Sequence, residues 1–187
     1  MIETSEFRKG LKVEMDGAPW VIVDFQHVKP GKGNSFTRTR LKNMITGQVV
    51  DHTFKSGDTL GKPDVEEAEV QFLYAMDDQY HFMNSSTYEQ LTVNKDSIEE
   101  AVPYLKEETT VGIVFYNGRA IGVNLPNFVE LKIIECEPGV KGDTATNATK
   151  TAKVETGYTL QVPLFVNQDE VIRIDTRNGQ YSERVRK

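Results

Sequence analysis

The sequence predicts an all-β protein built from three small barrel-like domains. Hydrophobic and polar residues alternate over short runs, as in strands that bury one face. Turn-forming residues interrupt these runs at short intervals, which is typical of small barrels and sandwiches. The charge balance also changes abruptly along the chain, which indicates separate modules with separate partners.

Three runs show the strand period most clearly, one near the beginning of the chain and two in its last third. Each has apolar residues at every second position, so each is expected to turn one face toward a core. In these runs Val21, Val23 and Phe25 alternate with Ile22 and Asp24, Val129, Leu131 and Ile133 alternate with Glu130 and Lys132, and Ile172 and Ile174 alternate with Arg173 and Asp175.

One segment predicts a helix instead. Asp96 is placed to cap it, with Glu99 at the capping-box position. Pro103 lies inside the pattern and is expected to limit the helix to a couple of turns. The predicted apolar face consists of Ile98, Ala101, Val102 and Leu105.

Domain boundaries are expected near residues 62 and 127, which gives domains 1–62, 63–127 and 128–187. The first holds 10 Lys and Arg against 7 Asp and Glu, a net +3. The second holds 3 against 12, a net −9, and the third balances at 9 against 9. The first domain could therefore meet phosphates, whereas the second would be repelled by them.

Several classes of protein are excluded by what the sequence lacks. No apolar run approaches the ~18 residues that span a bilayer, and the N-terminus has no signal-peptide pattern. A lone cysteine, Cys136, rules out an internal disulfide framework and is expected to be buried and inert. We therefore expect a cytoplasmic protein with no membrane partner, and a monomer.

The most informative local feature is the turn Lys29-Pro30-Gly31-Lys32-Gly33 between two strand-like runs, 20–28 and 36–44. Pro30 and Gly31 favour a type II turn in which Gly31 takes a positive φ. Gly33 has no side chain, so Lys32 would stand alone at the tip. Strands of about nine residues at ~3.3 Å each would hold it roughly 30 Å from the far end of the hairpin.

The second strand of this hairpin carries Arg38, Arg40 and Lys42 at every second position, so the three cations share one face. Such a row would follow a phosphate backbone. A solvated edge strand that blocks aggregation would have the same pattern. The glycine-flanked lysine is likewise compatible with an ordinary turn, so these residues alone leave both interpretations open.

Enzymatic and metal-binding classes fit less well. A Schiff-base lysine needs a desolvated site that lowers its pKa, whereas a hairpin tip is open to water. His27, His52 and His81 lie in separate segments and form no metal or triad spacing. No P-loop or dinucleotide fingerprint surrounds Lys32. We therefore predict a protein that is not an enzyme and that has no metal or cofactor.

The loop and several later segments resemble the elongation factor P family. The resemblance begins at Lys29-Pro30-Gly31-Lys32-Gly33 and the basic strand, and it extends along nearly the whole chain. It is strongest in the final third. The segments that carry it are 72–74, 81–83 and 87–90 in the middle, and 125–131, 137–144 and 162–166 toward the end.

This resemblance implies an SH3-like, KOW-type first domain and two OB-folds, arranged in an L that mimics tRNA. Such proteins enter the ribosome between the P and E sites when synthesis stalls at consecutive prolines. Lys32 would then reach the CCA end of the P-site peptidyl-tRNA, usually after extension by a lysine-modifying enzyme. Lys29 and the basic strand would lie near RNA.

The resemblance also assigns contacts to the third domain. Gly142, Asp143 and Thr144 match the loop that faces the E-site codon, and Tyr181 and Arg184 match positions of small-subunit contact. On the residues alone, Asp143 could simply order its turn and Tyr181 could belong to the core edge. Both ribosomal subunits are therefore expected partners.

Two further alternatives remain from the sequence. A general OB-fold RNA chaperone would bind single strands by stacking, but aromatic residues are only 9% of the chain and no basic aromatic cluster is present. Initiation factor five A has a similar lysine tip with two domains. The segment 162–184 favours the three-domain form.

Overall fold

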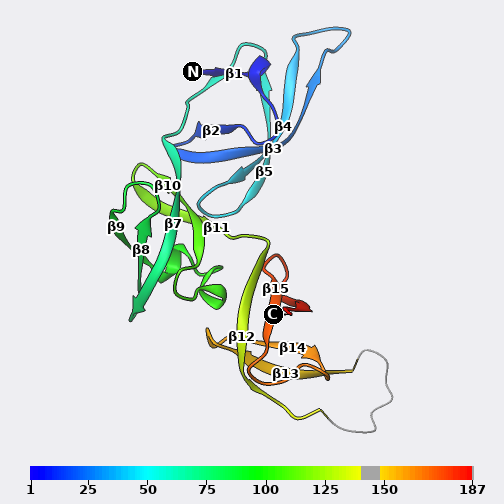
Figure 1. Ribbon diagram of the computed structural model, residues 1–187. Helices are drawn as coiled ribbons and strands as arrows, with labels where there is room; N and C mark the ends of the chain where they lie inside the picture. The colour runs from blue at the N-terminus through cyan, green and yellow to red at the C-terminus, as the bar shows by residue number, and fades with distance from the viewer. Residues whose placement is uncertain (140–147, 187) are drawn as a thin grey trace. The chain divides into compact units, whose positions relative to one another are not determined.

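The computed structural model describes residues 1–139 and 148–186, and nearly all of its regular structure is β-strand (Figure 1). The all-β prediction is confirmed. Among the described residues, no helix is long and apolar enough to cross a bilayer. The chain divides into two compact units, the first formed by Met1–Ala68 with Val114–Gly122 and the second by the described parts of Glu69–Ile113 and Val123–Lys187.

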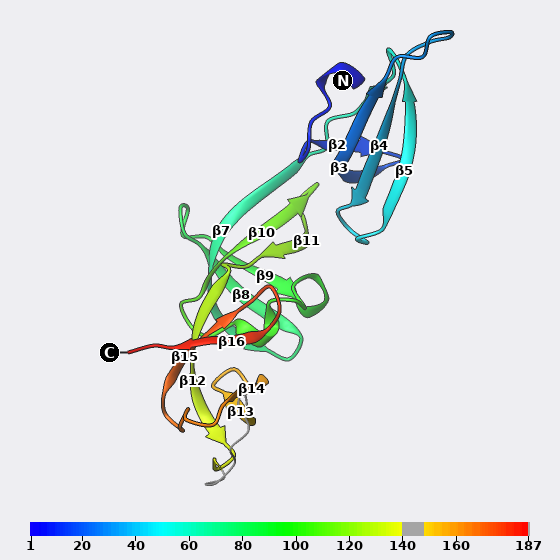
Figure 2. The same cartoon turned by 90° about the vertical axis from the view of Figure 1, so that its right-hand side faces the viewer.

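The first sheet is antiparallel, with the strand order β2-β3-β4-β5, and it contains the long hairpin β3–β4 (Figure 2). A short pair, β1 with β6, forms a separate two-stranded sheet. The elements of this region are β1 (Ile2–Glu3), the 3-10 helix η1 (Thr4–Glu6), β2 (Lys12–Met15), β3 (Ala18–Val28), β4 (Phe36–Asn43), β5 (Val49–Lys55) and β6 (Thr59–Leu60).

A compact apolar cluster fixes the base of that hairpin. Trp20 and Ile22 on β3 and Leu41 on β4 are almost fully buried. The ring of Phe54 on β5 meets that of Phe7 edge-on, with 5.4 Å between their centroids. The cluster consists of Phe7, Val13, Trp20, Ile22, Leu41 and Phe54.

The alternation predicted around residues 21–25 is interrupted in the structure. The pairing of β3 with β4 shifts between Ile22 and Asp24, which marks a β-bulge at Val23. Ile22 is buried at 1% exposure and Val23 is 43% exposed, so the core face predicted from Val21 and Val23 is wrong before the bulge. Beyond the bulge, Phe25 packs against the core cluster. An extra residue in one strand reverses the faces beyond it, and periodicity alone does not reveal this.

Two further five-stranded sheets follow along the chain. The middle sheet has the order β11-β10-β7-β8-β9, and the last has the order β14-β13-β12-β15-β16. Their strands are β7 (Val65–Met76), β8 (Gln79–Asn84), β9 (Gln90–Asn94), β10 (Thr110–Tyr116), β11 (Arg119–Asn124), β12 (Phe128–Cys136), β13 (Thr149–Val154), β14 (Thr159–Pro163), β15 (Val171–Asp175) and β16 (Gln180–Arg184).

These two sheets share one topology, which no sequence repeat indicated. In each, the first strand is central, the second and third strands lie on one side, and the fourth and fifth lie on the other. The first strand also has a register shift at the same place, between Phe72 and Tyr74 in β7 and between Ile133 and Glu135 in β12. Positions in the two sheets can therefore be equated residue by residue.

The last sheet has the faces that the sequence predicted. Leu131, Ile133, Ile172 and Ile174 are fully buried, whereas their neighbours along β12 and β15 are exposed or half-buried. Cys136 departs from expectation because it is half-buried at the edge of this core rather than enclosed by it. The buried cluster is Tyr104, Val129, Leu131, Ile133, Ala152, Val154, Leu160, Val162, Val166, Ile172 and Ile174.

The predicted helix is wrong as a helix but right in its buried residues. The segment forms two separate 3-10 turns, η2 (Lys95–Ser97) and η3 (Val102–Tyr104), and no side chain caps either of them. Pro103 has no amide hydrogen to donate to a continuous α-helical ladder. The residues predicted to share a face nevertheless pack inward, with Ile98, Ala101 and Leu105 buried and Val102 half-buried.

Candidate functional site

The candidate site begins at the loop that closes the β3–β4 hairpin. The two strands pair in register from Trp20 with Asn43 up to Val28 with Phe36. The loop beyond that last pair contains Lys32, and both views show it extending past the ends of its strands (Figures 1 and 2). The sequence-predicted hairpin and its lysine tip are therefore present.

Lys32 is exposed in this loop, and no hydrogen bond or ion pair within the described chain engages it. Residues 29–34 also neither donate nor accept a backbone hydrogen bond among those of the described residues. Lys29, the other predicted cation of the loop, is exposed as well. The loop thus presents two cations to solvent on a backbone that is not held by internal bonds.

The predicted turn geometry is wrong at one glycine. A type II turn at Pro30 requires a positive φ at Gly31, but the positive φ in this loop lies at Gly33, at +100°. A Cβ added at either glycine would meet nothing within 4 Å. Gly33 is therefore needed for backbone conformation, whereas Gly31 is needed neither for a positive φ nor for space.

The two strands below the loop are held by specific contacts. The amide of Ser56 donates to the carbonyl of Ser35 at 3.0 Å. His27 Nδ1 lies 2.9 Å from Thr37 Oγ1 across the hairpin. The Arg38 guanidinium lies over the Phe36 ring, 5.6 Å from its centroid. These contacts give Lys32 a fixed base from which to project.

The basic strand has the predicted two faces. Arg38, Arg40 and Lys42 are exposed, whereas the residue before each of them is buried: Thr37, Thr39 and Leu41 have 3%, 2% and 0% exposure. A surface pocket lies between Arg38 and Arg40 on the exposed side. The cations therefore form a continuous row that solvent or a ligand can reach.

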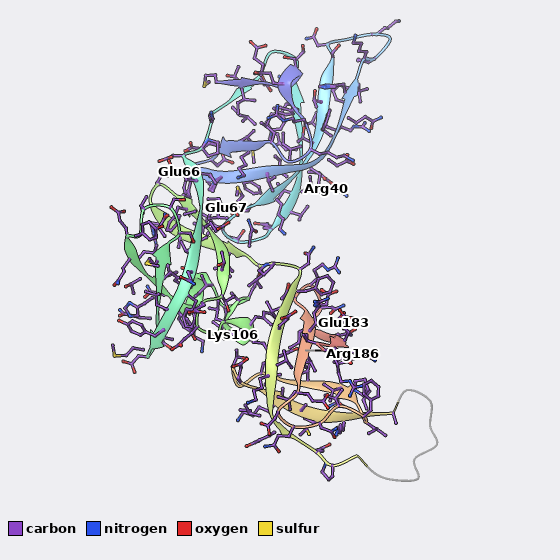
Figure 3. The ribbon with its side chains drawn as sticks, viewed as in Figure 1. Arg40, Glu66, Glu67, Lys106, Glu183 and Arg186 are labelled. Atoms are coloured by element: carbon purple, nitrogen blue, oxygen red, sulfur yellow. The ribbon has the colours of Figure 1, made fainter. Side chains whose placement is uncertain are left out.

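The structure distinguishes Arg40 from the other two cations. Its Nε donates to Asp51 Oδ1 on β5 at 3.0 Å (Arg40 is labelled in Figure 3). This hydrogen bond raises the pKa of Arg40 and lowers the pKa of Asp51. Sequence reasoning missed Asp51 because only the register of β4 with β5 brings it opposite Arg40. Part of the charge of Arg40 is therefore already compensated.

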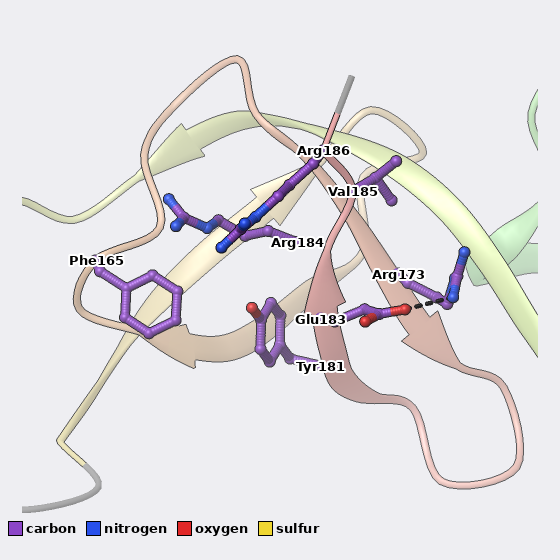
Figure 4. A pocket seen from close by; sticks show the side chains of 7 residues that line it. All are labelled: Phe165, Arg173, Tyr181, Glu183, Arg184, Val185 and Arg186. Carbon is purple, nitrogen blue, oxygen red and sulfur yellow. Dashed lines mark hydrogen bonds and ion pairs between the residues drawn. The ribbon is translucent and has the colours of Figure 1, made fainter.

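The third-domain candidates, Tyr181 and Arg184, line one surface pocket on β16 (Figure 4). The Arg184 guanidinium lies over the Phe165 ring at 4.8 Å, and its Nη1 reaches Glu170 Oε2 at 3.4 Å. Tyr181 is half-buried against the domain core, and this burial raises its pKa. One side of Tyr181 therefore packs at the edge of the core and the other lines the pocket, while a contact with the small subunit stays a prediction.

Sequence reasoning missed the other residues of this pocket. Phe165 is 57% exposed, which is unusual for so large an apolar side chain. Arg186 adds a second guanidinium, while Arg173 is already paired with Glu130 and Glu183. In the sequence, the two closely spaced arginines of Arg184-Val185-Arg186 could have indicated this pocket.

The remaining predicted contacts, Gly142, Asp143 and Thr144, lie outside the described residues. The three histidines do not come together in a metal or catalytic site, because each contacts a different neighbour. His27 contacts Thr37, His52 packs on Phe54, and His81 stacks on Tyr74. Within residues 1–139 and 148–186, no group of three or more acidic, histidine or cysteine side chains could hold a metal ion.

Three family models match successive parts of the chain. Residues 3–60 match the elongation factor P KOW-like domain, residues 65–123 match the elongation factor P OB domain, and residues 129–184 match the elongation factor P C-terminal domain. The KOW-type and OB architectures expected from the sequence are confirmed.

Solved structures support the same fold. A eukaryotic translation initiation factor 5A from Methanococcus jannaschii aligns with a TM-score of 0.54 at 24% identity, covering 64% of this chain and 88% of that one. A translation initiation factor of the same family from Naegleria fowleri gives 0.54 at 15% identity, covering 66% and 96%. At these identities the likeness concerns the fold alone.

Full-length relatives are much closer in sequence. Elongation factor P of Moorella thermoacetica is 51% identical over 98% of this chain and 100% of its own length. Elongation factor P of Bdellovibrio bacteriovorus is 52% identical over 99% of this chain and 98% of its own length. The chain therefore belongs to the elongation factor P family of translation factors.

Proposed function

We propose that this protein binds the ribosome between the P and E sites and stimulates peptide-bond formation at consecutive prolines by positioning peptidyl-prolyl-tRNA through Lys32. The observation that supports this best is the exposed, unengaged amine at the end of a hairpin whose base is packed and paired. Membership of the elongation factor P family supports it independently.

The chemistry requires a clamp rather than a catalyst that exchanges protons. Proline is a poor peptide donor and acceptor because its ring restricts the geometry of attack. Holding the reacting groups in a near-attack arrangement can contribute up to ~7–11 kcal/mol relative to free reactants. The ribosome supplies most of that already, so a few kcal/mol from one positioned cation suffices. An exposed lysine suits this role and does not suit Schiff-base chemistry.

The basic strand would hold the first domain on RNA. Arg38 and Lys42 are exposed and take part in no ion pair among the described residues, so they can neutralise phosphates directly. Arg40 would contribute less, because Asp51 competes for its guanidinium. Lys29 lies at the base of the loop and would contact the tRNA near Lys32.

The third domain would face the small subunit. Tyr181 and Arg184 offer an aromatic edge and a planar guanidinium around one pocket, and Phe165 adds an exposed ring. Gly142, Asp143 and Thr144 would meet the E-site codon through backbone and side-chain hydrogen bonds. With Lys32 at the large subunit, the factor would touch both subunits and would mimic the L shape of tRNA.

A covalent extension of Lys32 by a separate modifying enzyme completes the proposal. A longer cationic group would reach backbone oxygens of the CCA end that plain lysine does not. The exposed loop leaves the amine accessible to such an enzyme. The factor itself would act in the cytoplasm as a monomer, without a cofactor and without chemistry of its own.

Adding the protein to a translation system that lacks elongation factor P should relieve stalling at three consecutive prolines. Full-length reporter synthesis measures the relief, and a reporter without prolines should be translated equally with and without the protein. Stalling that persists with both the modified and the unmodified protein would contradict the proposed function.

Arg38→Ala should weaken ribosome binding and should reduce the slope of log K against log salt concentration by about 1. Arg40→Ala is the matched comparison and should change the slope by less, because Asp51 already neutralises part of that charge. Filter binding at several salt concentrations measures both slopes. Equal slopes for Arg38→Ala and the unaltered protein would exclude a phosphate contact at that position.

A further inference from the structure

From Gln71 onward, where β7 pairs with β8 and β8 with β9, one face of the middle sheet contains no charged side chain, and we call this part the uncharged face. It spans β7, β8 and β9, which lie side by side in Figures 1 and 2. The opposite side of these strands is the core, with Val70, Phe72, Phe82 and Val93 buried. Strand pairing arranges the uncharged face in three rows, Gln71–Met83–Gln90, Tyr74–His81–Thr92 and Met76–Gln79–Asn94.

The uncharged face is accessible and locally ordered. None of its residues is buried, and Tyr74 and Met76 are 50% and 59% exposed. Tyr74 stacks on His81 with 4.4 Å between ring centroids, and His81 Nδ1 lies 3.0 Å from Thr92 Oγ1. His81 Nε2 is shielded from solvent without a hydrogen-bond partner in the described chain. A partner would therefore meet a preformed surface.

The third domain shows that the fold does not require an uncharged face. Its sheet has the same strand order and the same register shift, so the equivalent of Tyr74–His81 is Glu135–Lys153. The amide of Glu155 donates to the carbonyl of Lys132, so these two residues form a cross-strand pair. This pair of the third domain is equivalent to Gln71–Met83 of the middle domain. Six positions of the uncharged face thus correspond to Lys132, Glu135, Glu137, Thr151, Lys153 and Glu155.

Acidic residues surround the uncharged face. Glu69 continues the same side of β7, and Asp77, Asp78, Glu89 and Asp96 lie in the turns at the strand ends. All five are exposed, and Lys95 is the one cation in the sequence between residues 69 and 96. Nucleic acid would be repelled by this rim and would find no cation at the centre.

We propose that the uncharged face binds a basic ribosomal protein whose contact surface has an uncharged centre and a rim of lysine and arginine. Protein interfaces favour tyrosine and methionine and exclude charge at their centre, while a rim of opposite charge steers association. The proposal rests on the proposed ribosomal function. It gives the acidic middle domain a partner that its charge attracts.

The double variant Tyr74→Glu/Met76→Glu tests the proposal. It places carboxylates on the uncharged face at the positions where the sheet of the third domain has Glu135 and Glu137. Both replaced side chains are largely exposed, so circular dichroism should be unchanged. Affinity for purified ribosomes that carry peptidyl-prolyl-tRNA should fall about tenfold or more. Thr151→Glu, at the position equivalent to Gln79, should change affinity less than twofold. Equal affinity of the double variant and the unaltered protein would overturn the proposal.

Site-specific photo-crosslinking identifies the class of partner. A photoreactive phenylalanine at Gln79, in the full chain bound to the same ribosomes, should crosslink to a ribosomal protein, whereas one at Thr151 should not. A crosslink to ribosomal RNA, to a second copy of the factor or to nothing overturns the proposal. Relief of proline stalling by the unaltered protein, measured in parallel, shows whether the proposed function survives that outcome.

Discussion

Replacing Lys32 by alanine should abolish the stimulation of peptide-bond formation at consecutive prolines while leaving the fold intact. The side chain is exposed and engages nothing within the described chain, so its removal costs no internal contact. If the amine holds the tRNA end, its loss should slow polyproline synthesis at least tenfold, or about 1.4 kcal/mol of transition-state stabilisation. Rapid-quench measurement of tripeptide formation gives this rate directly.

Two controls separate the charge of Lys32 from the proposed modification. Lys32→Arg keeps the cation but offers no amine to a lysine-modifying enzyme, so it should equal unmodified protein and fall below modified protein. Lys29→Ala removes a neighbouring cation of the same loop and should have a smaller effect. A Lys32→Ala protein that works at the unaltered rate would remove the central role of this residue.

Replacing Leu41 by alanine should destabilise the first domain by about 2–5 kcal/mol. Leu41 is fully buried in the cluster that fixes the base of the hairpin, so its truncation removes buried apolar contacts and leaves a cavity. The single tryptophan, Trp20, belongs to the same cluster, so urea unfolding followed by its fluorescence reports on this domain. A loss of this size also lowers the population of chains that can present Lys32.

The exposed neighbour of Leu41 is the matched control. Lys42→Ala changes the other face of the same strand and should alter stability by no more than about 0.5 kcal/mol. If both variants unfold at the same urea concentration, Leu41 does not support the hairpin in the way its burial indicates.

Much of the fold and part of the candidate site were predictable from residue patterns. The two-residue period placed Arg38, Arg40 and Lys42 on one face and predicted the buried side of β12 and β15, because alternation is a local property of extended chain. The prominence of Lys32 also followed from its glycine neighbours and the strand runs on each side.

The features that sequence reasoning missed depend on register or on backbone angles. The Val23 bulge and the pairing of Asp51 with Arg40 come from how the strands align, and the positive φ at Gly33 rather than Gly31 is a backbone angle of the loop between them. The helix predicted around Asp96 followed from local propensity, but Pro103 and tertiary packing turned it into two short 3-10 turns. The uncharged face likewise depends on the pairing of three strands, β7, β8 and β9, and no single strand shows it.

The loop around Lys32 has no internal backbone hydrogen bonds among the described residues, and this has a thermodynamic consequence. Such a loop loses little enthalpy when it changes shape around a bound tRNA end, so the opposition to binding is chiefly entropic. Fixing each backbone residue costs about 1–2 kcal/mol. The proposed longer group on the lysine would add contacts that offset this ordering cost without altering any part of the fold beneath it.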